Sequence, residues 1–197
     1  MKGNNASLVQ YIQKTFPLGV DKAEEIADRF SEKTARKNEL VLTEGRICKE
    51  FYFLEEGFIW SYTRDINGNN ITTNFYSDKQ VVGEFYSFFK QIPGKENYQA
   101  LTGCQLWCIT FDELQLAFHS MPEFREFGRS MLVSAYADSK QRMLSMLHHT
   151  AEERYSLLIT ENPDIFQYAS LKTIASYLGI TNTSLSRIRK EFSKNYK

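Results

Sequence analysis

Residues 171–190 read LKTIASYLGITNTSLSRIRK and contain two apolar patterns of helical spacing, separated by a four-residue corner. Ser170 and Thr181 precede the two patterns, and both residue types cap helix N-termini because the hydroxyl accepts a bond from a backbone N–H of the first turn. Gly179 follows the first pattern, where a residue with positive φ would end the helix and turn the chain. The stretch therefore predicts two short helices joined at a tight corner.

The apolar and small residues of this stretch fit a helix-turn-helix at seven positions. Ala175 lets the two helices approach closely, Gly179 permits the bend, and the apolar residues form a small shared core that continues to Phe192. An arbitrary helical hairpin would match fewer of these positions. The seven residues are Ile174, Ala175, Leu178, Gly179, Ile180, Leu185 and Ile188.

The outward residues of the second helix have the chemistry of a DNA-recognition helix. Short hydrogen-bonding side chains occupy its N-terminal end and cations follow, as expected for a helix whose first turns face base edges in a major groove. The whole chain has 24 Lys plus Arg and 24 Asp plus Glu, so attraction to DNA must come from local charge. The predicted DNA-binding residues are Thr181, Asn182, Thr183, Ser186, Arg187, Arg189 and Lys190.

Composition bounds the class of protein. The 197 residues suffice for one large domain or for a medium and a small one, and 42% hydrophobic residues allow a packed core. The three cysteines, Cys48, Cys104 and Cys108, form no disulfide framework, which favours a reducing compartment. Cys104 and Cys108 would share one face of a strand as small buried residues. The N-terminus lacks the apolar segment of a secretory signal and no window reaches membrane-spanning length, so we expect a cytoplasmic protein without a membrane partner.

Three regimes follow one another along the chain. Residues 7–37 have helical spacing, whereas 40–110 consist of short aromatic and β-branched runs broken by glycine, which is typical of an antiparallel barrel or sandwich. Asn67-Gly68 separates two such runs and predicts a hairpin, because both residue types tolerate positive φ. The predicted strands are 40–42, 51–56, 58–63, 71–76, 80–82 and 106–110.

Helices dominate the rest of the chain. Residues 112–118 predict a short helix, Pro122 to about His149 a long one, and Ala151 to about Thr160 another. The long helix carries apolar residues on more than one face, which favours packing on its own barrel and on the same helix of a second copy. The first face holds Phe124, Phe127, Met131 and Ala135, and the others Leu132, Tyr136, Met143 and Leu147.

A glycine-punctuated β-roll, a long helix and a C-terminal helix-turn-helix together resemble the Crp–Fnr family of bacterial transcription regulators. The resemblance implies an α+β fold: an antiparallel, jelly-roll-like β-roll with flanking helices (1–118), a long dimerisation helix (119–150) and a DNA-binding domain (151–197). It also implies a homodimer that reads a two-fold symmetric site on double-stranded DNA, a small-molecule effector in the roll, and contact with RNA polymerase in an activator.

The effector site departs from the family's cyclic-nucleotide pattern. Gly83, Glu84 and Phe85 match the start of the phosphate-binding cassette, but residues 92–100 contain no arginine, and Lys95 is their only cation. Losing the bidentate arginine removes the main contact to a cyclic phosphate. The four residues Gly83, Glu84, Phe85 and Lys95 stay candidates for effector binding, tight binding of cyclic AMP is not expected, and Glu84 is expected to remain as a capping carboxylate.

Other family cofactors also lack their ligands here. No cysteine precedes Cys48, so an iron–sulfur cluster is not expected, and the histidines His119, His148 and His149 all lie beyond the strands, which argues against haem. No metal ligands are predicted. Family members usually continue into a β-hairpin wing, which we expect to be lacking or truncated here.

Two other classes of function compete with a DNA-binding regulator. A cupin-like enzyme would need histidine and carboxylate metal ligands on the strands, but residues 40–110 contain no histidine. Because no nucleophile elbow or P-loop occurs either, we expect no enzyme and no catalytic residues. A ligand-binding module that regulates a partner protein without DNA stays open, and it would show no salt-sensitive affinity for DNA.

Overall fold

The computed structural model describes residues 4–195, and the chain divides into two units. The first unit ends at Ser61 and resumes over Phe75–Ala135, whereas the second comprises Tyr62–Asn74 and everything from Tyr136 onward. The three segments expected from the sequence, 1–118, 119–150 and 151–197, stay a prediction. Residues beyond Asn195, on which the expectation about the wing bears, lie outside the described part of the chain.

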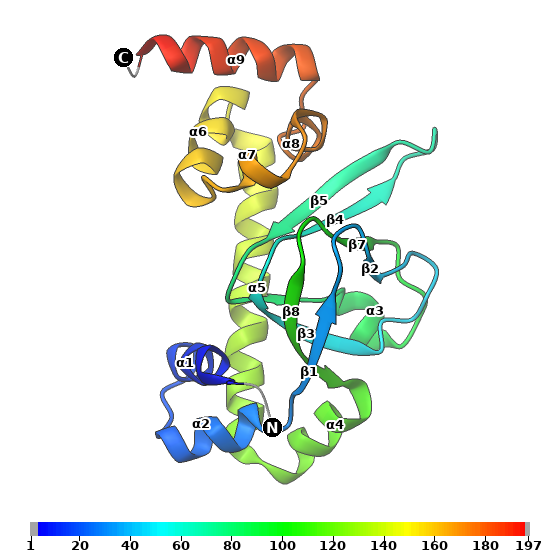
Figure 1. Cartoon of the computed structure of the whole chain (residues 1–197), viewed down its shortest axis with the longest axis vertical. Coiled ribbons are helices and arrows are strands. Elements are labelled where there is room, and N and C mark those ends of the chain that lie inside the picture. The colour runs from blue at the N-terminus through cyan, green and yellow to red at the C-terminus, as the bar shows by residue number, and fades with distance from the viewer. Residues whose placement is uncertain (1–3, 196–197) are drawn as a thin grey trace. The chain divides into compact units, whose positions relative to one another are not determined.

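Strands and helices follow one another as Figure 1 shows. The strands are β1 (Ser31–Ala35), β2 (Leu40–Leu42), β3 (Glu50–Glu56), β4 (Ile59–Arg64), β5 (Asn70–Tyr76), β6 (Gln80–Val82), β7 (Asn97–Ala100) and β8 (Cys104–Thr110). The helices are α1 (Ala6–Thr15), α2 (Val20–Ala27), α3 (Phe85–Lys90), α4 (Phe111–Ser120), α5 (Pro122–His148), α6 (Ala151–Glu161), α7 (Ile165–Tyr168), α8 (Leu171–Tyr177) and α9 (Asn182–Asn195).

The strands form two four-stranded sheets within the described residues, in the orders β1-β8-β3-β6 and β2-β7-β4-β5. Strand β8 pairs antiparallel with both β1 and β3, and β3 pairs antiparallel with β6. Consecutive strands alternate between the two sheets except for β4 and β5, which are neighbours in the second sheet, and this is the arrangement of a roll and not of a parallel sheet. The antiparallel β-roll predicted from the sequence is confirmed, and all six predicted strands occur within two residues of their expected ends.

Strand β3 separates two apolar clusters because its side chains alternate between its faces. Phe51 and Phe53 belong to the cluster with the helices, while Tyr52 and Leu54 belong to the cluster inside the roll. Cys104 and Cys108 are buried in the inner cluster as free thiols, which confirms the prediction that they share one buried face.

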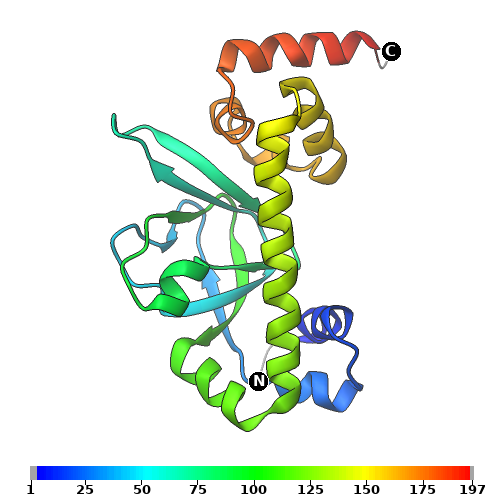
Figure 2. The same cartoon turned by 180° about the vertical axis from the view of Figure 1, so that it is seen from behind.

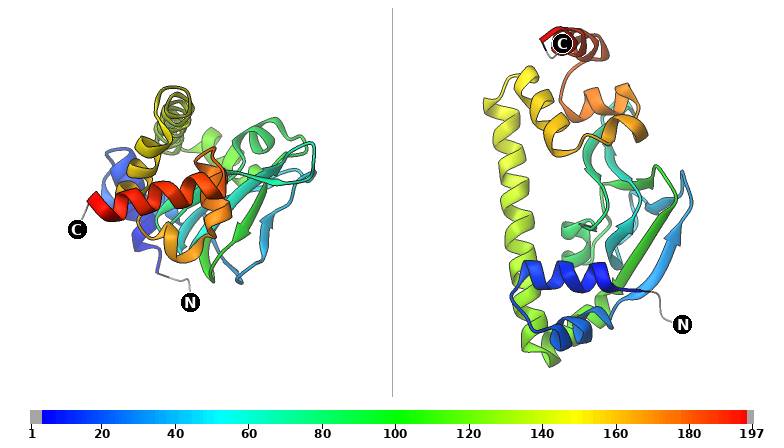
Figure 3. Two further views of the ribbon diagram at one scale, coloured as in Figure 1. Left: turned by 90° about the horizontal axis from the view of Figure 1, so that it is seen from above. Right: turned by 60° about the vertical axis from the view of Figure 1, so that its left-hand side comes forward.

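Helices α1 and α2 lie beside the N-terminal part of α5, as the right-hand view of Figure 3 shows. The ring of Tyr11 on α1 lies 5.1 Å from that of Phe53 and 6.3 Å from that of Phe127, so it joins helix, sheet and helix. Leu8, Ile12 and Phe124 are buried in the same cluster. The helices therefore anchor α5 on the roll through one continuous apolar core.

The prediction that the helical region extends to residue 37 is wrong for residues 31–35. These residues form β1, which pairs with β8 so that Ser31 lies opposite Cys108 and Ala35 opposite Cys104. Pairing over this sequence distance carries no local signal, and the segment SEKTA has little apolar alternation to reveal it. Strand β7 and helix α3 were not predicted either.

Helix α5 is one continuous helix of 27 residues that begins at Pro122, and Figure 2 shows it without a break. Proline suits the first helical position because its missing N–H would have no partner there. Phe124, Phe127 and Met131 are buried, whereas residues Tyr136 and Leu147 are 72% and 70% exposed. Three of the four residues predicted on the first face are therefore packed within the chain. Of the other predicted residues, Leu132 packs against the same core, whereas Tyr136, Met143 and Leu147 are exposed.

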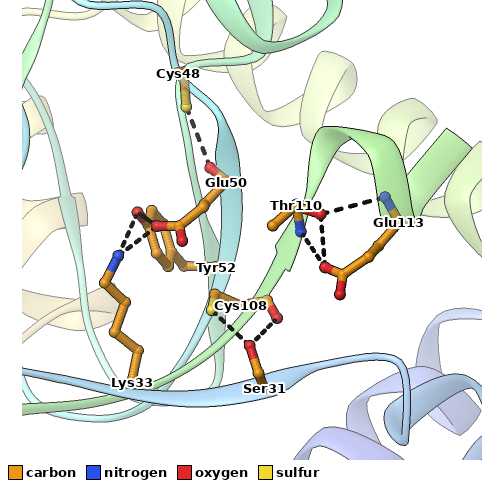
Figure 4. Close-up of polar contacts among 8 residues, drawn as sticks. All are labelled: Ser31, Lys33, Cys48, Glu50, Tyr52, Cys108, Thr110 and Glu113. Carbon is orange, nitrogen blue, oxygen red and sulfur yellow. Dashed lines mark hydrogen bonds and ion pairs between the residues drawn. The ribbon is translucent and has the colours of Figure 1, made fainter.

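Two helices begin with a capping box, in which an N-cap threonine and a glutamate three residues on satisfy each other's backbone N–H groups. Thr110 and Glu113 form one at the start of α4 (Figure 4), and Thr150 and Glu153 form the other at the start of α6. Each box fixes where its helix begins, which confirms the predicted starts of both helices to within one residue.

The tip of the β4–β5 hairpin belongs to the second unit. The carboxylate of Asp65 accepts the backbone N–H groups of Asn67 and Asn69 at 2.8 Å each, and Gly68 adopts φ +79°. These bonds replace the strand ladder where the chain reverses, as Asp does in turns. The hairpin predicted at Asn67-Gly68 is confirmed.

Candidate nucleic-acid interface and sensor site

Helices α8 and α9 form the predicted helix-turn-helix, and both starts are capped as expected. The hydroxyl of Ser170 accepts the N–H of Thr173 at 3.1 Å, and that of Thr181 accepts the N–H of Ser184 at 3.1 Å. Each bond satisfies a backbone donor that a helix start leaves without a partner. The two helices therefore begin at the residues that the sequence predicts.

The corner between the helices is a Schellman motif. Gly179 adopts φ +67°, its N–H donates to the carbonyl of Ser176 at 3.1 Å, and the N–H of Ile180 donates to that of Ala175 at 3.0 Å. These two bonds define the motif, which requires a left-handed residue at the position of Gly179. The geometric role predicted for Gly179 is confirmed.

The inner face of the helix-turn-helix is packed as predicted. Ile174, Ala175, Leu178, Leu185 and Ile188 are all buried. Further along α9, the ring of Phe192 lies edge-on to that of Tyr155 in α6, with 5.2 Å between their centres. These contacts bury the inner face of α9, and the opposite face is exposed.

That outer face consists of the residues predicted to contact DNA. All seven are exposed, and residues three and four apart lie on one side of a helix, so Asn182, Ser186 and Arg189 line up along it. Hydrogen-bonding groups stand at the N-terminal end and cations further on, as the sequence predicts. The exposed residues are Thr181, Asn182, Thr183, Ser186, Arg187, Arg189 and Lys190.

Two arginines that the sequence does not single out bind the last carbonyls of α8, next to the corner. Arg154 of α6 donates from Nε and Nη2 to the carbonyl of Leu178 at 3.1 and 2.9 Å, and Arg142 of α5 donates from Nη2 to the carbonyl of Tyr177 at 3.1 Å. The last carbonyls of a helix lack partners within it and attract cations. An arginine on a polar helix carries no sequence signal of such a role.

Glu84 occupies the start of α3 but does not cap it. Its side chain accepts no bond from the helix N-terminus, so the prediction of a capping carboxylate is wrong. The side chain instead turns toward Gly94, where an added Cβ would lie 1.8 Å from Oε2. Glycine at position 94 is therefore what leaves room for the carboxylate.

The carboxylate of Glu84 is buried with one oxygen unsatisfied. The residue has 7% relative exposure, Oε1 accepts the N–H of Lys95 at 3.5 Å, and Oε2 has no hydrogen-bond partner. Burial raises the pKa of this carboxyl above its usual range, and the charge of Glu96 adds to the shift. Such a group could accept a hydrogen bond from a hydroxyl of a bound molecule.

The other candidate effector residues are not gathered around Glu84. Phe85 packs edge-on against Phe51, with 4.8 Å between ring centres, and Gly83 lies against the same ring. Both therefore serve the core between the sheet and the helices. Lys95 is exposed and meets Glu84 through its backbone N–H.

Aromatic rings fill the roll beside the second half of the cassette. Tyr98 is buried, stacks on Tyr76 with 5.9 Å between ring centres, and donates its hydroxyl to Glu96 at 3.0 Å. Burial is the main reason that the pKa of Tyr98 lies well above the ordinary value, so the phenol stays protonated. These rings occupy the wall of the roll without offering a group that could neutralise a phosphate.

A second polar cluster in the first unit satisfies its own charges (Figure 4). The ammonium of Lys33 pairs with the carboxylate of Glu50, and the hydroxyl of Tyr52 donates to the same carboxylate at 2.6 Å. Burial raises the pKa of Tyr52, and its bond to Glu50 raises it further. A phenol that keeps its proton and an internally paired lysine give this cluster a structural role.

No group of three or more histidine, cysteine or acidic side chains suited to a metal ion occurs among the described residues. None of the helices in residues 4–195 combines the length and apolar character needed to cross a membrane.

Comparison with known proteins agrees with this architecture. Residues 32–120 match the model of the cyclic nucleotide-binding domain. The chain is 24% identical over 186 residues to the anaerobic regulatory protein of Haemophilus influenzae, covering 89% of this chain and 71% of that protein. Its being named a regulatory protein agrees with the expectation that this chain is not an enzyme.

Solved structures share the fold. The structure of FixK2 from Bradyrhizobium japonicum matches with a TM-score of 0.72 at 19% identity, covering 84% of this chain and 85% of that one. A transcriptional regulator of the crp/fnr family from Eubacterium rectale matches with a TM-score of 0.68 at 16% identity, covering 92% and 88%. The chain therefore contains a region similar to a cyclic nucleotide-binding domain, and it shares its fold with solved regulators that include a member of the crp/fnr family.

Proposed function

We propose that the chain is a sequence-specific DNA-binding transcription regulator that acts as a homodimer in the cytoplasm. The observation that carries the proposal is the outer face of α9, where all seven predicted DNA-binding residues are exposed. Asn182 and Thr183 would meet base edges, while Arg187, Arg189 and Lys190 would neutralise phosphates. Because the chain as a whole is neutral, this local positive charge would supply the attraction to DNA.

The open face of α5 supports a dimer with a second copy of the chain. Four apolar residues on this face are exposed: Val133 (59%), Tyr136 (72%), Met143 (46%) and Leu147 (70%). Successive members are separated by three, seven and four residues. This is the a/d spacing of a two-stranded coiled coil, in which each apolar residue packs against its partner helix. Two recognition helices related by two-fold symmetry would enter successive major grooves about 34 Å apart.

The β-roll is proposed to be either degenerate as a sensor or specific for an effector other than a cyclic nucleotide. Glu84 keeps a buried acceptor oxygen for a ligand hydroxyl, but no arginine in residues 92–100 could hold a phosphate. A thermal-denaturation series with cyclic AMP tests this. A ligand present at 100 times its Kd would stabilise the protein by about 2.7 kcal/mol. If cyclic AMP bound with a Kd of roughly 10 µM, 1 mM would therefore raise Tm clearly. We expect no shift in Tm at this concentration, and a clear shift would contradict the proposal.

Selection of duplexes from a random pool, followed by fluorescence anisotropy, tests DNA binding. The wild-type protein should select a two-fold symmetric site and bind it more weakly as salt rises. Arg187→Ala combined with Arg189→Ala should weaken binding by about 100-fold, since each lost contact costs about tenfold. Arg129→Ala is the matched control, because Arg129 lies exposed on α5 and pairs with Glu126.

Failure of the wild-type protein to prefer any duplex, or equal binding by the double variant and the control, would overturn the DNA-binding proposal. A protein that shows no salt-sensitive DNA affinity would then be examined as a module that regulates a partner protein. Contact with RNA polymerase stays a prediction of the family resemblance.

A further inference from the structure

Arg142 of α5 joins the β4–β5 hairpin to the helix-turn-helix within the second unit. Its Nε donates to the carbonyl of Thr73 on β5 at 3.2 Å, and its Nη2 donates to the carbonyl of Tyr177 at the end of α8 at 3.1 Å. The centre of its guanidinium also lies 3.6 Å from the centre of the Tyr177 ring. One half-buried side chain therefore fixes the middle of a strand and the end of a helix to each other.

Thr72 makes a second connection between the same two elements. Its N–H donates to the hydroxyl of Ser176 at 2.9 Å, and its own hydroxyl donates to the carbonyl of Thr173 at 3.0 Å. Thr72 has 4% relative exposure, so both bonds are shielded from water. Because Thr72 is buried, breaking either bond would cost more than breaking the same bond at the surface.

These contacts lie close to the corner, so they can affect the orientation of the recognition helix α9. Tyr177 is the last residue of α8, and only Leu178 separates it from Gly179, at which the chain turns toward α9. A small rotation of α8 about its axis would swing the corner and with it the N-terminal end of α9. The planar guanidinium resists such a rotation because it stacks on one ring and donates in two fixed directions.

We infer that Arg142 is a positioning residue for DNA recognition: it holds α8 on the hairpin so that α9 is presented in the orientation that fits a major groove. The inference rests on the proposed DNA-binding function and deepens it. Its two hydrogen bonds end at carbonyls of β5 and α8, so it would act on α9 through the corner. The hairpin segment Tyr62–Asn74 belongs to the same unit as α8 and α9, so the contact lies within one unit.

The test compares Arg142→Ala with the wild-type protein on two duplexes: the site selected by the wild-type protein, and an unrelated sequence of equal length. We expect affinity for the selected site to fall about tenfold or more, because a misplaced helix loses base contacts. Affinity for the unrelated duplex, which depends on phosphate contacts, should stay within about twofold. A purely structural role would reduce the folded fraction and thus lower both affinities equally.

Two further measurements sharpen the result. On sites whose half-sites are moved apart by one base pair, the wild-type protein should lose affinity steeply and Arg142→Ala only slightly, since a loosely held corner tolerates several spacings. Thr72→Val removes the bond to the Thr173 carbonyl with little change of shape, and it should reduce specific affinity in the same direction. Arg129→Ala, an arginine on the same helix that pairs with Glu126, should match the wild-type protein throughout.

Each outcome decides one question. If Arg142→Ala does not fold, the same affinity and spacing measurements are made on Arg142→Lys and Thr72→Val, because both variants preserve most of the packing. Unchanged specific affinity and unchanged spacing preference in these variants would overturn the inference while DNA binding stands. A wild-type protein that selects no duplex would instead refute the proposed function on which the inference rests.

Discussion

Gly179 lies directly against the side chain of Met146: a methyl group added at Gly179 would sit 2.6 Å from the Met146 Cε. The long helix α5 therefore touches the corner of the helix-turn-helix at the residue that also adopts φ +67°. The left-handed backbone favours glycine at this position, and the close approach of Met146 leaves no room for a side chain unless the Met146 methyl moves.

Gly179→Ala should destabilise the protein by about 1–2 kcal/mol, mainly through the left-handed backbone. The Met146 methyl is the far end of a flexible side chain and can move, so the close approach should add little. Urea denaturation followed by circular dichroism measures the change in the free energy of unfolding.

Gly179→Asn separates these two causes. Asparagine is larger than alanine but tolerates positive φ better than other residues with a side chain. It should therefore cost less than Gly179→Ala, and the reverse order would show that the contact with Met146 dominates. Gly103→Ala is the control, because a Cβ there meets nothing within 4 Å and the backbone is not left-handed.

Asn182→Ala and Lys190→Ala should weaken DNA binding in different ways. Loss of the amide at position 182 removes a group suited to a base edge, so affinity for the selected site should fall by about tenfold while affinity for unrelated DNA stays constant. Loss of the Lys190 ammonium should weaken binding to both duplexes and reduce the slope of log K against log salt by about 1.

Anisotropy titrations at several salt concentrations measure both effects, with Lys37→Ala, an exposed lysine of the first unit, as control. If Asn182→Ala reduced affinity for both duplexes equally, the assignment of the α9 N-terminus to base contacts would have to be abandoned.

The helix-turn-helix could be predicted residue by residue because its determinants act locally. Ser170 and Thr181 satisfy backbone groups within one turn, and Gly179 sets the backbone at its own position. Local rules of this kind need no knowledge of the rest of the fold. The exposure of the outer face of α9 follows from the same helical period.

Strand β1 could not be predicted in this way. Its register with β8 joins Ser31 to Cys108, and the hydroxyl of Ser31 lies 3.1 Å from the Cys108 sulfur. What stabilises the strand is its partner far along the chain, while its own residues have weak strand propensity. Tertiary pairing overrides the local pattern there.

The residues that hold the corner of the helix-turn-helix could not be predicted for a similar reason. Arg142 and Arg154 are ordinary residues for a polar helix face, and only the folded chain brings them to the carbonyls of Tyr177 and Leu178. For Glu84, the cassette pattern predicts the position of the carboxylate, but its contact depends on Gly94, ten residues away in the chain.

Lys140 is expected to weaken the proposed dimer. It lies seven residues after Val133 and seven before Leu147, within the exposed a/d series of α5. In a parallel two-fold dimer it would face its own copy, and a lysine at a central a position favours the two-stranded state at a cost in stability. Lys140→Leu should therefore lower the dimer dissociation constant by about tenfold, or about 1.4 kcal/mol.

Sedimentation equilibrium measures this constant. Leu147→Glu should raise it, because the substitution places a charge where an apolar contact is expected. Gln141→Leu, an exposed neighbour one position off the series, is the matched control and should leave the constant unchanged. If Gln141→Leu and Lys140→Leu both tightened association, the gain would come from nonspecific hydrophobic association and not from the a/d positions of α5.

Glu84 should make the stability of the folded chain depend on pH. Burial raises the pKa of Glu84 above the ordinary value of 4.5, so between the two values the folded protein holds a proton that the unfolded chain has lost. The free energy of unfolding then decreases as pH rises through this interval, by at most about 1.4 kcal/mol per pH unit for one group. Above the folded-state pKa the contribution is fully lost and the dependence ends.

Glu84→Gln removes this titration while keeping the shape of the side chain. The free energy of unfolding of the variant, minus that of the wild-type protein, should therefore increase as pH rises from about 4 and level off once Glu84 is ionised. Urea denaturation at a series of pH values gives this difference directly. Glu32→Gln, at an exposed position of β1, is the control for loss of a surface carboxylate. A difference that stays constant across the series would show that Glu84 is not protonated preferentially in the folded state.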